Sequence, residues 1–251
     1  MVTEKNISAE SKGEGSRMKN IVDLTARLVK YNLKIIFANR FLWFLLVALL
    51  VFILISVIAV LDNSGLSGSF IYGSLLLPGI LLLFYPTVFG IQNDEDARVL
   101  EILFGIPDYR YKVWLVRLVM TYLFLYVIMV FFTWLGSVLL MPVPVFEMAG
   151  QLMFPLVFIG MLAFMLSTLI RSGTGTAVVL VLVGVGLLML QDAVDRSMWN
   201  IFHNPYDVPR RMNEMMWARV TIKNRLFLVS GAVLFLLYGL LNLQKREKFI
   251  K

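Results

Sequence analysis

Six long stretches of almost uninterrupted apolar residues constrain this chain more than any other feature of its sequence. A helix that crosses the roughly 30 Å hydrocarbon core of a bilayer needs about 20 consecutive apolar residues. The runs cover residues 41–61, 70–91, 118–141, 151–170, 174–190 and 226–243. The sequence therefore predicts an all-α membrane protein with six transmembrane helices.

The composition agrees with a membrane protein and excludes several kinds of chemistry. Only 16% of the residues are charged, whereas soluble domains carry roughly a quarter. The chain has no cysteine and one histidine, His203, which excludes thiolate chemistry and histidine-cluster metal sites. It also lacks a phosphate-binding loop, a zinc-protease motif and a nucleophile elbow. We therefore predict that the chain is not an enzyme and has no catalytic, cofactor or metal site.

The positive charge of the chain is a topology signal. The net charge is +7, but the basic residues flank apolar runs and form no patch with stacking aromatics, so nucleic acid is not an expected partner. With the amino terminus inside, most of the 23 Lys and Arg residues fall on the inner side, as inner loops favour. Both termini are therefore predicted to be cytoplasmic.

The two ends of the chain are polar. Residues 1–17 lack an apolar core and are interpreted as a disordered cytoplasmic tail, not a signal peptide, and residues 244–251 as a second cytoplasmic tail. Residues 18–40 have an apolar stripe and a basic stripe, which predicts an amphipathic helix along the inner membrane surface. The alternative is a soluble helix packed on a partner. The basic stripe includes Arg27, Lys30 and Lys34.

The inner loop at residues 93–112 is predicted to contain a short helix with two faces. One face carries Asp94, Arg98 and Glu101, and the other carries Val99, Leu103 and Ile106. Such a helix, held between two membrane spans, is suited to docking in a groove on a cytoplasmic partner. The alternative is a solvated loop with salt bridges between neighbouring turns.

The outer loop at residues 191–225 differs from the other short connections. Aromatic residues alternate there with charges, which predicts interfacial helices at the outer leaflet; an ordinary solvated loop is the alternative. The aromatic residues are Trp199, Phe202, Tyr206 and Trp217. His203 is interpreted as a surface or interfacial side chain with no assigned role. Gly184 and Gly186 in the fifth run, with Gly173 and Gly175 just ahead, suit close helix packing.

Ionisable side chains are missing from the middle of all six runs, with Arg117, Arg171 and Asp192 at their ends. Ion-coupled carriers usually place such groups inside the bundle. A secondary carrier is therefore disfavoured, although backbone carbonyls and hydroxyls can also bind ions.

The segment from Asp96 to Pro107, which reads DARVLEILFGIP, resembles the coupling region of ABC-2 type transporter permeases. Members of that family typically read Glu-x-Gly-Thr-Leu-Glu-x-Leu-Leu-x-x-Pro there. The positions that match are Leu100, Glu101, Leu103 and Pro107, whereas Arg98 and Val99 replace the usual Gly and Thr. The amphipathic helix, the six runs and the LSTLIRSG sequence at 166–173 extend the similarity to nearly the whole chain.

The resemblance implies a permease subunit that pairs with a second copy or homologue and with separate ABC ATPase subunits, which bind ATP and Mg²⁺. This chain would export or extrude a substrate that the sequence does not name, from a multi-pass position in the cytoplasmic membrane of a prokaryote. The outer loop would be the place for an extracytoplasmic partner. The implied ATPase-coupling residues are Asp94, Arg98, Val99, Leu100, Glu101, Leu103, Phe104, Pro107, Arg27, Lys30 and Lys34.

Two other functions remain open on the sequence alone. One is a membrane anchoring or assembly subunit that moves no substrate. The other is a secondary carrier or channel, for which flux would follow an ion gradient without ATP.

Overall fold

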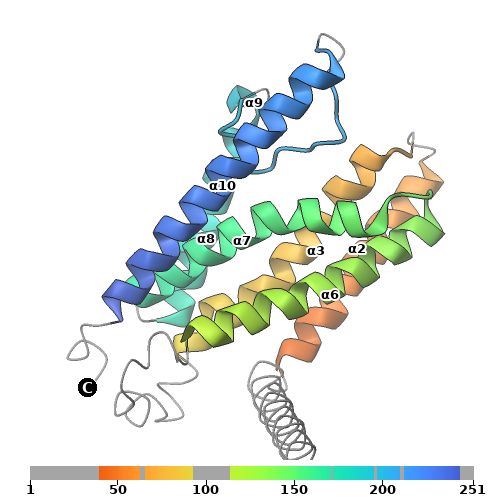
Figure 1. Ribbon diagram of the computed structural model, residues 1–251. Helices are drawn as coiled ribbons and strands as arrows, with labels where there is room; N and C mark the ends of the chain where they lie inside the picture. Colours follow the sequence, from red (N-terminus) through yellow and green to blue (C-terminus); the bar gives the residue numbers. More distant parts are fainter. Residues whose placement is uncertain are drawn as a thin grey trace, which may run out of the picture. The chain divides into compact units, whose positions relative to one another are not determined.

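A computed structural model describes residues 40–62, 66–92, 114–170, 172–194, 197–209 and 212–243, all within one compact unit. Every regular element in these ranges is a helix (Figure 1). The helices are α2 (Arg40–Leu61), α3 (Gly68–Val88), α6 (Val116–Leu139), α7 (Val145–Ile170), α8 (Gly173–Met189), α9 (Gln191–Val194) and α10 (Glu214–Asn242).

Five of the described helices are long and apolar enough to cross a membrane, namely α2, α3, α6, α7 and α10. This confirms an all-helical chain of the multi-pass membrane type. The fifth predicted span corresponds to α8, which has 17 residues and is therefore about 26 Å long. Six spans and cytoplasmic termini stay predictions.

Helix α7 lies at the centre of the bundle and contacts α3, α6, α8 and α10, while α2 packs mainly on α3. Aromatic rings join α7 to α10, because the ring of Phe158 lies 5.9 Å from that of Phe227 and 5.2 Å from that of Phe235. Small residues let α3 approach α7 closely: a Cβ atom at Gly79 would lie 2.8 Å from Leu156. These contacts fix the positions of α3, α8 and α10 around α7.

The glycines of α8 do not all behave as the sequence predicts. Gly173 packs closely against Phe89 at the end of α3. By contrast, a Cβ atom at Gly184 or Gly186 would meet no atom of the described residues within 4 Å. The prediction of close packing is therefore wrong for these two residues. Helices α3 and α7 continue through the prolines inside them.

Two helices begin six or more residues before the apolar runs. Helix α7 begins at Val145 instead of residue 151, and α10 begins at Glu214 instead of residue 226. Residues 214–225, which were predicted to be outer loop, form about three turns of α10. The reason is that Trp217 and Asn224 share the buried face of Leu228, so burial extends the helix beyond the apolar run.

The remaining predictions fall outside the described residues. They concern the tails at 1–17 and 244–251, the coupling loop at 93–112 and residues 18–39 of the amphipathic helix. The last residue of that predicted helix, Arg40, is the first residue of α2. Outside with them lie Asp94, Arg98, Val99, Leu100, Glu101, Leu103, Phe104, Pro107, Arg27, Lys30 and Lys34.

Candidate functional site

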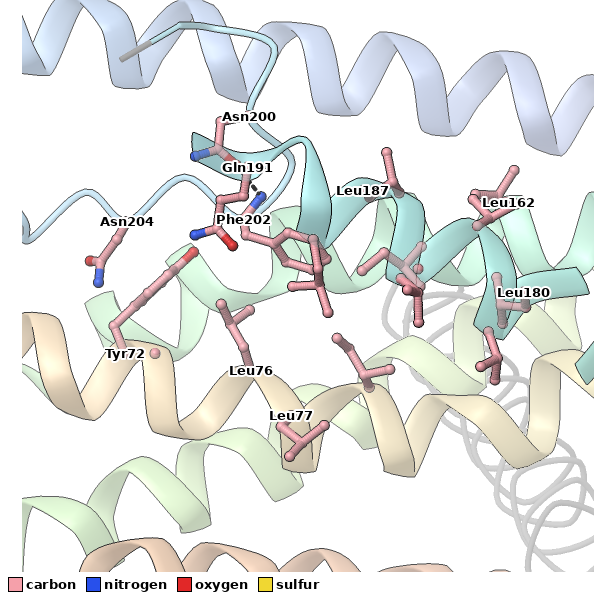
Figure 2. A pocket seen from close by; sticks show the side chains of 18 of the residues that line it. Tyr72, Leu76, Leu77, Leu162, Leu180, Leu187, Gln191, Asn200, Phe202 and Asn204 are labelled. Carbon is pink, nitrogen blue, oxygen red and sulfur yellow. Dashed lines mark hydrogen bonds between the residues drawn. The ribbon is translucent and has the colours of Figure 1, made fainter. Parts of the chain in front are cut away.

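A cavity of about 1010 Å³ lies between α3, α7, α8 and the segment at 197–209. We call it the chamber. Figure 2 shows leucines of α3, α7 and α8 along its length, with Tyr72, Gln191, Asn200 and Asn204 gathered toward one end. The chamber thus has a long apolar part and a polar end.

Helical periodicity explains which residues line the chamber. On α3 the lining residues include Gly73, Leu77 and Ile80, which are spaced four and three residues apart and share one face. On α8 the same spacing relates Leu180, Gly184 and Leu187. The two faces oppose one another across the cavity. Because Gly184 has no side chain, α8 leaves this space open.

The side of the chamber between α3 and α8 carries apolar residues that are also exposed on the surface. Leu77 is 50% exposed and Leu188 is 56% exposed, and both line the chamber. In a helix that crosses a membrane, such exposed apolar side chains face lipid. If α8 crosses the membrane beside α3, as the sequence predicts, this edge of the chamber lies in the hydrocarbon region.

The polar end of the chamber is built by the segment at 197–209, which is tied to α3. The Nδ2 of Asn204 donates to the backbone oxygen of Ser69 at 2.9 Å and to its hydroxyl at 3.0 Å. The Oδ1 of Asn204 accepts from the backbone N–H of Tyr206 at 3.0 Å. Both polar atoms of this amide hold the loop, so Asn204 shapes the chamber and has little capacity left for a ligand.

Behind the polar end lies Arg225 of α10, which is only 7% exposed. Its guanidinium donates to the Oε1 of Gln151 at 2.9 Å, to the Oδ1 of Asn224 at 3.0 Å and to the hydroxyl of Tyr72 at 3.3 Å. It also lies 5.2 Å from the ring centre of Phe154. Arg225 thus connects α3, α7 and α10 at one point.

Asn224 joins this arrangement to the loop. Its Nδ2 donates to the backbone oxygens of Met198 at 2.9 Å and Asn200 at 2.8 Å. Since its Oδ1 accepts from Arg225, the same amide links the guanidinium to the loop that closes the chamber.

His203 is buried, with an exposed fraction of 1%, so it is not a surface side chain, and its position at the membrane interface stays a prediction. Its Nε2 lies 2.8 Å from the hydroxyl oxygen of Thr221, and its ring centre lies 4.5 Å from that of Trp217. Its Nδ1 makes no hydrogen bond within the described part of the chain. Burial, followed by the charge of Arg225, lowers the pKa of His203 to about 4. The imidazole is therefore neutral at pH 7.

Tyr206 lies on the same loop, with its ring centre 5.9 Å from that of Tyr72. Burial, and next the negative charge of Glu147, raise the pKa of Tyr206 to about 12. The phenol is neutral at physiological pH and serves as part of the packing between the loop and α3.

Sequence reasoning missed Arg225 because it stands at the edge of an apolar run and was counted with the loop. A signal was present: Trp217, Thr221, Asn224 and Leu228 follow one another at spacings of four, three and four residues, as on one face of a helix. Thr221 and Asn224 are polar, so this periodicity did not extend the predicted span, because a bilayer-spanning helix is recognised from its apolar residues alone.

Of the ionisable residues predicted at the ends of the spans, Arg117 is described and does not line the chamber. Arg117 lies in the first turn of α6, with its guanidinium carbon 5.3 Å from the ring centre of Trp114. Arg171 and the side chain of Asp192 fall outside the described residues.

The chamber offers binding without evident bond-making chemistry. Across the described ranges, no group of three or more His, Cys, Asp or Glu side chains could hold a metal ion. The groups at the polar end are amides, a phenol and the carboxylate of Asp207, which are suited to orienting a bound molecule. Comparison with protein-family models, curated proteins and solved structures finds no match to this chain.

Proposed function

We propose that this chain is the transmembrane permease subunit of an ATP-driven exporter of the ABC-2 type. The observation that carries the proposal is the chamber, because a transporter needs a ligand-sized space between its membrane helices. Three of the five long apolar helices, α3, α7 and α10, contribute residues to its lining. The motif at 96–107 adds the expected site for a cytoplasmic ATPase.

The proposal assigns energy coupling to a partner. Closure of the ATPase on ATP would act through the residues at 94–107 and shift the bundle between two states, provided that ATP binds one of them better. We place the assembly in the cytoplasmic membrane of a prokaryote, with a second permease copy or homologue.

A secondary carrier is the second candidate, since Arg225 places an ionisable group inside the bundle. The geometry favours it less. A guanidinium does not lose its proton in proteins, and this one is already engaged by three neutral oxygens. Arg225 therefore supplies no proton relay. Flux in proteoliposomes that follows an ion gradient without ATP would establish the carrier instead.

The first experiment is purification of the tagged chain in mild detergent, followed by mass spectrometry and an ATPase assay. We expect an ABC ATPase to copurify. A preparation without one would favour a membrane anchoring or assembly subunit.

The coupling helix is tested by Leu103→Asp, which places a charge on its predicted apolar face. We expect loss of the copurifying ATPase or of its stimulation, because docking in an apolar groove excludes a carboxylate. Leu103→Met conserves volume and polarity and should retain coupling. Normal ATPase stimulation by the Leu103→Asp protein would contradict the assignment.

A further inference from the structure

The chamber lining identifies what kind of molecule could occupy it. Along α3 the lining runs from Tyr72 to Phe84, a distance of about 18 Å at the helical rise. One leaflet contributes about half of the roughly 30 Å hydrocarbon core. The apolar part of the chamber is therefore about as long as one lipid hydrocarbon chain.

The edge between α3 and α8 gives such a chain a way in. Leu77 and Leu188 belong to the lining and are also exposed where the helices would face lipid. A molecule dissolved in the bilayer can reach the chamber there without crossing water, whereas a polar solute cannot. The volume of about 1010 Å³ lies at the upper end of the roughly 300–1,000 Å³ of ordinary ligand pockets.

The polar end selects the head of the occupant. Among the lining residues that the structure describes, Asp207 has the only carboxylate and none is basic, so these side chains disfavour an anionic head. A cationic head would meet the guanidinium of Arg225 directly behind the Tyr72 hydroxyl. Gln191 and Asn200 add neutral amides to the lining. An uncharged head with hydroxyl or amide groups fits between the two charges.

We propose that the chamber binds a lipid-type amphiphile, with its hydrocarbon chain between α3 and α8 and an uncharged, hydrogen-bonding head at the polar end, beside Gln191. This inference rests on the proposed function, since it names the substrate class of the same permease.

The test is photo-crosslinking of the purified full chain in lipid nanodiscs. The probe is a monoacylglycerol with a diazirine at the end of its chain, and the comparison probe is the corresponding phosphate, lysophosphatidic acid, with the same chain. Mass spectrometry maps the adducts. We expect the neutral probe to label the lining faces of α3 and α8, and the phosphate probe to label them about tenfold less, a difference that one unfavourable charge contact readily produces.

Two glycines of α8 provide a matched pair of variants. Gly184 lines the chamber and Gly186 does not, and a Cβ atom at either position meets nothing within 4 Å. Gly184→Phe should fill the chamber and lower labelling by about tenfold, whereas Gly186→Phe should leave it unchanged. Equal thermal unfolding of both variants and the parent shows that the fold is kept.

Three results would overturn the inference. They are labelling that Gly184→Phe does not change, labelling spread evenly over the exposed faces of α2 and α6 as for surrounding lipid, and crosslinks that join two copies of the chain through the chamber. Equal labelling by the phosphate probe would overturn the assignment of the head. The experiment uses the chain without ATPase or nucleotide. If no ATPase copurifies, the permease proposal is contradicted, but crosslinked adducts in the chamber would still support lipid binding. If the adducts are missing, only the lipid-binding inference is contradicted.

Discussion

The guanidinium of Arg225 is held among neutral groups at a junction of three helices. Removing a charge from water costs several kcal/mol, and here three oxygens and the face of Phe154 replace water. A buried guanidinium is stable only if its hydrogen-bond acceptors are held in place. In turn, the acceptors on Gln151 and Tyr72 need Arg225 as their hydrogen-bond donor.

Arg225→Ala should lower the free energy of unfolding by about 2–4 kcal/mol, because it leaves the half-buried Gln151 amide and the buried Tyr72 hydroxyl without their donor. Arg219→Ala, an exposed site on the same helix, should change it by less than about 0.5 kcal/mol. Denaturant or thermal unfolding of the purified proteins measures both. Equal changes in the free energy of unfolding for the two variants would show that the hydrogen bonds of Arg225 do not contribute to stability.

His203 makes the loop over the chamber sensitive to acid. Its folded-state pKa of about 4 lies below the ordinary 6.5, so the unfolded or open state takes up the proton first. Stability is therefore highest above about pH 6.5 and falls as the pH decreases toward about 4, where the folded imidazole itself becomes protonated.

We expect the melting temperature of the parent protein to decrease between pH 7 and pH 4 more than that of His203→Gln, whose amide can still reach Thr221. The fluorescence of Trp217, 4.5 Å from the imidazole, should report the opening. Parallel curves for parent and variant would show that His203 does not cause the acid sensitivity.

At the scale of helices, the apolar runs predicted where each element lies but not where two of them begin. Helix α10 extends to Glu214 because Asn224 and Arg225 find partners far away in the sequence, on Met198 and Tyr72. A hydropathy profile ends the predicted span at polar residues such as these. The polar junction was therefore invisible to the sequence, whereas the spans themselves followed from the length of the apolar runs.

Contact between α7 and its neighbours depends on Gly160. A Cβ atom there would meet the hydroxyl of Tyr122 and the side chain of Leu83. Gly160→Ala should lower the free energy of unfolding by about 1–3 kcal/mol through overpacking. Gly150→Ala on the same helix, where nothing lies within 4 Å, gains the same helix propensity without a clash. Unfolding measurements in which Gly160→Ala is as stable as Gly150→Ala would show that α7 does not need this close approach.

For the whole molecule, the chamber could not be predicted from the sequence, because it arises from how far α8 stands from α3. Gly184 was expected to bring helices together and instead leaves space between them. The coupling residues around Leu103 were predicted from their two-faced spacing and from a motif, and they stay a prediction. The number of membrane crossings likewise depends on α8.

The absence of cysteine allows the topology to be tested with single cysteines and a membrane-impermeant maleimide in bacterial cells. Asp62→Cys and Asp207→Cys should react in intact cells, and Ser8→Cys and Lys251→Cys only after permeabilisation, because six spans return the chain to its starting side. Reaction of Lys251→Cys in intact cells, with Ser8→Cys protected, would mean five crossings.

The short length of α8 has a consequence for the lipid around it. At about 26 Å, this helix of 17 residues is several ångströms shorter than the roughly 30 Å hydrocarbon core, and a bilayer meets such a mismatch by thinning locally. Lipid hydrocarbon chains beside α8 would then be compressed and disordered. A lipid chain that moves from this region into the gap between α8 and α3 therefore loses less packing energy than one that leaves the bilayer elsewhere around the protein.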